Sequence, residues 1–130
     1  MDQHELVEFW RKSADHGVNA MDNLFSAGNY DWALFIGHLI VEKILKARWI
    51  LDNTGGIPPK THNLDKLARE TRYPFSEEQL TWLVQASDFN LETRYPDYKM
   101  EFYKRATKDF AELHVAKVKE LFECVQKTLL

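Results

Sequence analysis

The sequence contains few cysteines, glycines and prolines, and it lacks a long apolar run. Cys124 is the one cysteine among 130 residues, so no disulfide can form within the chain, which fits a reducing compartment. No apolar run approaches the roughly 20 residues that cross a bilayer. The first residues also lack the basic and apolar regions of a signal peptide. We therefore expect a cytoplasmic protein that does not enter a membrane.

The chain also has no excess of positive charge. The formal net charge is -3, which does not fit a general nucleic-acid binder. Instead, the chain is 45% hydrophobic and 13% aromatic and contains four tryptophans, as is typical of a globular domain with a core rich in rings. Its length predicts one domain, residues 1–130, with a core that needs no disulfide or metal.

Apolar residues recur with the helical period along most of the chain, and no segment alternates with period two. Gly28 predicts the end of a first helix, with Asn29 capping the next. Ser76 and Gln79 form a capping-box pattern that opens a later helix. We predict an all-α, up-down bundle of four to five helices. The predicted ranges are 4–27, 30–53, 61–71, 76–89 and a long C-terminal helix over 98–129, with a loop containing Gly55, Gly56, Pro58 and Pro59 after the second.

The second predicted helix is apolar nearly all round, which indicates a central, buried helix. Its polar exceptions, His38, Glu42 and Lys46, follow one another at steps of four and therefore form one narrow seam. In one interpretation, the seam lines a cleft and contacts a nucleotide phosphate or ribose. In the other, Glu42 and Lys46 form an intrahelical ion pair and His38 bonds a backbone group.

Three segments, taken in order, resemble a known family. The first runs from Gly28, Tyr30 and Ala33 into a stretch with His38, Glu42, Lys43, Leu45, Lys46 and Ala47. The second is Thr61, His62, Leu64 and Leu67, and the third is residues 93–97, Thr-Arg-Tyr-Pro-Asp. Their order and spacing resemble the HEPN domain, and the resemblance covers nearly the whole chain.

The resemblance implies several properties. HEPN domains are helical bundles that commonly form homodimers. Many small ones bind a nucleotidyltransferase encoded beside them, some as toxin–antitoxin pairs, and many others are ribonucleases. We therefore expect an interaction or nucleotide-binding module that partners a minimal nucleotidyltransferase.

The ribonuclease branch of the family depends on an Arg followed by a His after four to six residues, near the start of the last helix. Arg94 stands at about the right place, but Lys99, Met100 and Glu101 occupy the positions for the histidine. None of these three can act as a near-neutral acid or base as His does. The alternative function is a divergent, metal-independent ribonuclease that acts on RNA through Arg94 and a base other than this histidine.

Residues 94–97 complete the set of candidate binding residues: His38, Glu42, Lys46, Arg94, Tyr95 and Asp97. Arg94 could reach a phosphate at the helix start, where N–H groups favour anions. The structural alternative has Asp97 capping the last helix and Arg94 pairing with Asp97 or Glu42.

Of the remaining histidines, His62 lies at the start of the short predicted helix, and His4 and His114 have no partner pattern. We expect His62 to be a cap or packing residue, and His4 and His114 to be solvated. The five histidines show no metal-ligand spacing in the sequence, so we predict no metal and no cofactor other than a nucleotide ligand.

Overall fold

The computed structural model of the chain describes residues 1–54, 56–92 and 94–130, which form helices, turns and loops without a strand. The predicted all-α class is thereby confirmed. Gly55 of the predicted loop and Thr93 of the 93–97 segment lie outside the described residues. The helices are α1 (Gln3–Ser26), α2 (Tyr30–Asp52), α3 (Leu64–Arg69), α4 (Glu77–Ser87), α5 (Pro96–Arg105), α6 (Lys108–Gln126) and a final 3-10 helix (Lys127–Leu129).

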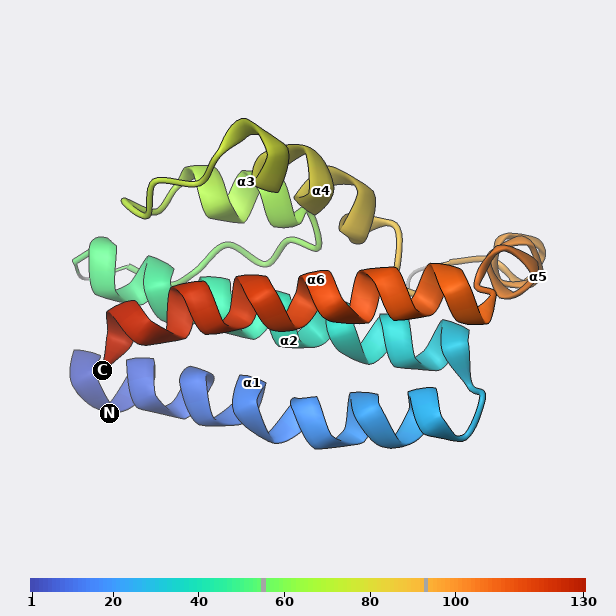
Figure 1. The fold of residues 1–130 in the computed structure, drawn as a ribbon. Helices are drawn as coiled ribbons and strands as arrows, with labels where there is room; N and C mark the ends of the chain where they lie inside the picture. The colour runs from blue at the N-terminus through green and yellow to red at the C-terminus, as the bar shows by residue number, and fades with distance from the viewer. Residues whose placement is uncertain (55, 93) are drawn as a thin grey trace.

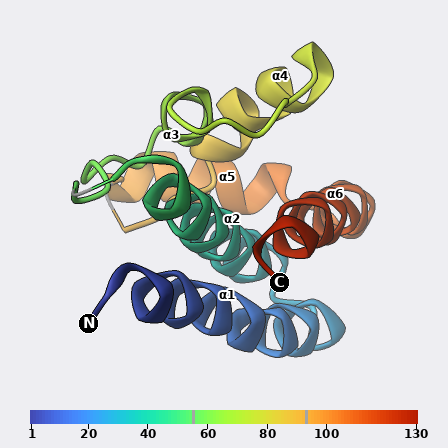
Figure 2. The ribbon, with the colours of Figure 1, turned by 90° about the vertical axis from the view of Figure 1, so that its left-hand side faces the viewer.

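Helix α2 lies at the centre of the molecule. Helices α1 and α6 lie along it, while α3 and α4 cover its side opposite α1, and α5 lies at one end (Figures 1 and 2). Twelve residues of α2 are buried, against three of α1, because α2 has neighbours on most sides and α1 has them on one. None of the described helices combines the length and the hydropathy that a segment crossing a bilayer would need.

The turn between α1 and α2 forms as predicted around Gly28, whose φ of +82° is a conformation that favours glycine. The N–H of Gly28 donates to the carbonyl of Phe25 (3.0 Å), and the N–H of Asn29 donates to that of Leu24 (2.9 Å). These two bonds make the Schellman motif that ends α1. Asn29 holds the N-cap position of α2, but its side chain bonds none of the described backbone N–H groups there.

The helix predicted over residues 98–129 is two helices. Helix α5 ends at Arg105, and α6 begins at Lys108. Thr107 accounts for the break, because its Oγ1 accepts a hydrogen bond from the N–H of Phe110 and so caps α6. The break lets α5 turn across the end of the bundle (Figure 1), where Phe102 packs on Phe89 with ring centroids 5.6 Å apart.

The other helix boundaries follow the prediction with small changes. The capping box of Ser76 and Gln79 is confirmed, with both reciprocal bonds present at the start of α4. Helix α3 is shorter than the predicted 61–71 and begins only at Leu64. Residues 53, 54 and 56–63 therefore lie outside the helices, and His62 in this connection contacts Glu42 of α2.

Candidate functional site

The predicted seam on α2 is a connected set of polar side chains inside the bundle. His38 and Glu42 are buried. Lys46 Nζ donates to Glu42 Oε2 at 3.2 Å, and His38 Nδ1 lies 3.1 Å from the carbonyl oxygen of Ala86. Both contacts of the structural interpretation, the intrahelical ion pair and the bond of His38 to a backbone group, are thus present.

His62 joins the seam from the connection before α3. Its Nδ1 lies 3.0 Å from Glu42 Oε1, and His38 Nε2 approaches the same oxygen at 3.5 Å. His62 does not cap α3, whose N-cap position is held by Asn63; it contacts Glu42 and lies beside the His38 ring, with centroids 6.1 Å apart. Its side chain is 48% exposed, so this corner of the cluster opens to solvent.

Asn90 and Trp10 complete the surroundings of the cluster. Asn90 Nδ2 lies 3.3 Å from His38 Nε2, and Asn90 follows directly on the buried Phe89 after α4. On the other side, Lys46 Nζ lies 5.2 Å from the centre of a Trp10 ring, within the range of a cation–π contact. The cluster therefore joins α1, α2, the connection before α3 and the end of α4.

Glu42 is ionised at neutral pH in spite of its burial. Burial alone raises the pKa of this carboxyl group, but the ring nitrogens of His38 and His62 and the charge of Lys46 outweigh burial and lower the pKa to about 2. The negative charge of Glu42 is thus held inside the protein by three partners. A buried charge is tolerated under such conditions.

Arg94 and Asp97 bond residues outside this cluster, and Tyr95 lies beside them in the sequence. Arg94 pairs with Asp88 at 3.2 Å and lies over the ring of Tyr98 at 4.6 Å, and no hydrogen bond or ion pair among the described residues joins it to Glu42 or Asp97. Tyr95, not Asp97, holds the N-cap position of α5. Asp97 lies in the first turn and accepts from the N–H of Tyr98. The predicted cap by Asp97 and the predicted pairings of Arg94 are therefore wrong.

The prediction of a solvated His114 is also wrong. His114 is buried, and its Nδ1 accepts a hydrogen bond from the Trp82 indole N–H at 3.0 Å. The rings of Phe89 and Phe110 lie against it, with centroids 5.2 and 4.4 Å away. Burial lowers the pKa of His114, so this residue belongs to the aromatic core.

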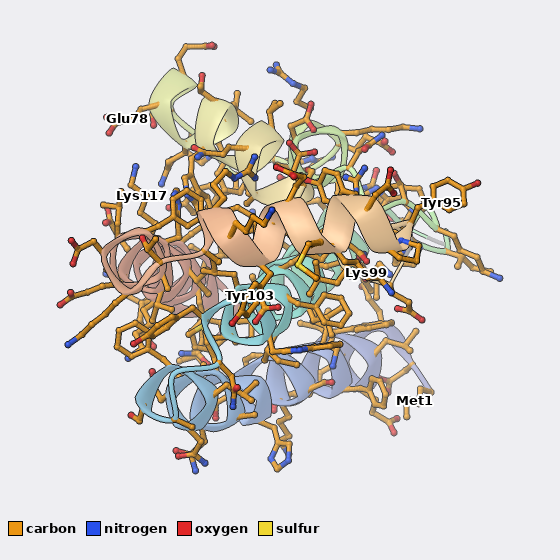
Figure 3. All side chains as sticks on the ribbon, turned by 90° about the vertical axis from the view of Figure 1, so that its right-hand side faces the viewer. Met1, Glu78, Tyr95, Lys99, Tyr103 and Lys117 are labelled. Atoms are coloured by element: carbon orange, nitrogen blue, oxygen red, sulfur yellow. The ribbon has the colours of Figure 1, made fainter. Side chains whose placement is uncertain are left out.

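A separate groove of about 330 Å³ lies between α4 and α6. Glu78 and Lys117, which contribute to its lining, face the same side of the molecule in Figure 3. Its size matches small-ligand pockets. None of the six predicted binding residues lines it.

The helical arrangement around a central helix that carries the buried His38 and Glu42 and the partly buried Lys46 defines a small all-α domain. A family model described as the HEPN domain matches residues 7–128. The chain belongs to the HEPN domain family. The fold is similar to the crystal structure of TT1696 from Thermus thermophilus, with a TM-score of 0.78 and 18% sequence identity, over 95% of this chain and 98% of that chain. A comparison with curated protein sequences gave no match.

Proposed function

We propose that this chain is a HEPN interaction module that binds a nucleotidyltransferase through the exposed face of α5. The single observation that carries the proposal is the composition of that face. Tyr95, Lys99 and Tyr103 lie along α5 at the end of the bundle (Figure 3). Tyr95 is 81% exposed, Tyr103 is 63% exposed and the neighbouring Met100 is 55% exposed.

This face brings two exposed tyrosines and an exposed methionine together. Large apolar side chains that gather on the outside of a domain mark interaction sites, and tyrosine and methionine are enriched in protein interfaces. Lys99 and Tyr103 are four residues apart on α5 and Tyr95 holds its N-cap position, so one partner surface can contact all three. The bundle behind α5 holds this face in place through the buried Phe102.

A nucleotidyltransferase is the partner class because of the family to which the chain belongs. The positive charge of Lys99 between two tyrosines favours an aromatic and acidic patch on that partner. If one component arrests growth when it is expressed alone, and the other relieves the arrest, the pair is a toxin–antitoxin system.

The test is co-purification with the product of the neighbouring gene, which the proposal expects to be a nucleotidyltransferase. The double substitution Tyr95→Ser and Tyr103→Ser should weaken the complex at least tenfold, since buried aromatic anchors dominate interface energies. Val84→Ser is the matched control, because Val84 is 53% exposed on α4, outside this face. Unchanged affinity of the double variant in calorimetry would remove α5 from the interface.

Nucleotide binding at the seam stays a prediction. Lys46 is engaged by Glu42 and lies against Trp10, so a phosphate group would compete with the carboxylate for this ammonium group. The alternative ribonuclease needs a general base close to Arg94. No histidine is among the described side chains that hydrogen-bond Arg94 or lie under its guanidinium group, which are Asp88 and Tyr98. The geometry therefore supports the interaction module better.

A further inference from the structure

Three potential metal ligands converge at the cluster on α2. His38 and Glu42 are one helical turn apart, and His62 approaches from the connection before α3. One ligand atom of each lies within 4.8 Å of the other two. The three residues are independent of the α5 face on which the proposed function rests.

The hydrogen bonds around His38 fix the position of its ring proton. Nδ1 faces the Ala86 carbonyl oxygen, which only accepts, so Nδ1 carries the proton. Asn90 Oδ1 accepts from the N–H of Glu92 at 2.9 Å, which turns the Asn90 amide nitrogen toward His38 Nε2. The amide donates, so Nε2 presents a lone pair. Glu42 Oε1 lies 3.5 Å from the same nitrogen, so one ion can contact both atoms.

We propose that His38 Nε2, Glu42 Oε1 and His62 Nδ1 bind a divalent transition-metal ion of the zinc class. Ligand atoms around tetrahedral zinc lie about 3.4 Å apart, given bonds of about 2.1 Å. The two separations from Glu42 Oε1, 3.0 Å to His62 and 3.5 Å to His38, bracket that value. The ion would replace the long Asn90 bond at His38 Nε2.

The surroundings of the three ligands have the features of a built site. A metal-binding histidine usually donates its other N–H to a carbonyl or carboxylate, as His38 does to Ala86. Lys46 bonds the second carboxylate oxygen, Oε2, and leaves Oε1 to the ion. The half-exposed His62 opens a path for the ion and for a water molecule as a fourth ligand.

Ligand type selects the class of ion. Two imidazole nitrogens with one carboxylate suit Zn²⁺ and its first-row neighbours, whereas Mg²⁺ and Ca²⁺ prefer oxygen ligands. The positive charge of Lys46 opposes the ion. The small number of protein ligands also limits the affinity. We therefore expect about micromolar binding, weaker than that of a closed structural zinc site.

The test is titration of the tag-free, chelator-treated protein with Zn²⁺ by calorimetry, and with Co²⁺ by visible absorption, which reports tetrahedral coordination. We expect one ion per chain. His62→Ala and Glu42→Gln should each weaken binding tenfold or more, while His16→Ala should not, because His16 is exposed on α1 and outside the cluster.

Circular dichroism checks that each variant is folded, and His62→Ala is the decisive one because its side chain is half exposed. Loss of the Co²⁺ spectrum in a folded His62→Ala protein supports the site. The proposal is overturned if the wild-type protein binds no Zn²⁺, or if folded His62→Ala binds it as tightly as wild type. The cluster would then be a hydrogen-bonded network alone.

Discussion

Glu42 couples the stability of this protein to pH. Its pKa is about 2 in the folded protein, against an ordinary value of 4.5. A lowered pKa contributes stability that is complete above pH 4.5 and is lost as the pH falls toward 2, because the unfolded chain takes up the proton first.

Glu42→Gln should lower the free energy of unfolding at pH 7 by an amount on the order of 2 kcal/mol. It should also flatten the fall in stability between pH 4.5 and 2. Urea unfolding followed by circular dichroism, with chelator present, measures both effects. Glu112→Gln is the control, since Glu112 is exposed on α6. An acid profile unchanged by Glu42→Gln would mean that the cluster does not hold this charge.

The residues of the cluster were predictable only in part. His38, Glu42 and Lys46 stand out as polar positions at steps of four in an apolar helix. His62 lies in a loop 20 residues from Glu42, and Asn90 lies 52 residues from His38, so no helical period connects them. His114 was missed for the same reason, because its partner Trp82 is 32 residues away on α4.

At the scale of the helices, the close contact of α1, α2 and α6 depends on Gly37. A Cβ atom at this position would lie 3.0 Å from Val118 Cγ2 on α6 and 3.2 Å from Met21 Sδ on α1. Overpacking costs about 1–3 kcal/mol, and the better helix propensity of alanine returns about 1 kcal/mol. Gly37→Ala should therefore destabilise the bundle by about 1 kcal/mol in urea unfolding.

A double-mutant cycle isolates the contact with α6. Val118→Ala removes the methyl group nearest to the new Cβ, so the combined Gly37→Ala and Val118→Ala variant should lose less stability than the sum of the two single changes. A more stable Gly37→Ala protein would show that α2 and α6 can separate without cost.

The helices themselves were predicted well where the signal is local. The ends of α1 and α2 lie beside Gly28 and before the glycine-containing loop, and the capping box of α4 needs only four residues. The break between α5 and α6 has no glycine or proline. Its one local sign is Thr107, and the turn there also depends on Phe102 packing against Phe89, a contact between distant segments.

At the scale of the whole molecule, the single chain has a complete core. Its accessible surface is 7490 Å², close to the roughly 7,100 Å² of a compact monomer of this size. Self-association must therefore join folded chains. Besides the α5 face, the chain offers a shallow groove between α1 and α2, lined by Gly17, Ala20, Ile36 and Leu39 among others. We propose that the homodimer expected from the resemblance forms at this groove, whose lining includes the exposed Ala20 and the partly buried Ile36 and Leu39, and that the α5 face remains for the nucleotidyltransferase.

Light scattering after size exclusion should give twice the chain mass of 15.3 kDa at micromolar concentrations. Leu39→Glu buries a charge in the proposed dimer groove and should give a monomer, because an unpaired buried charge is costly. The Tyr95→Ser and Tyr103→Ser variant should remain a dimer while losing the partner, and Val84→Glu on the opposite side of α2 should change neither property. A wild-type monomer would refute self-association. A Leu39→Glu dimer would instead move the interface away from the groove, with α5 as the next surface to test.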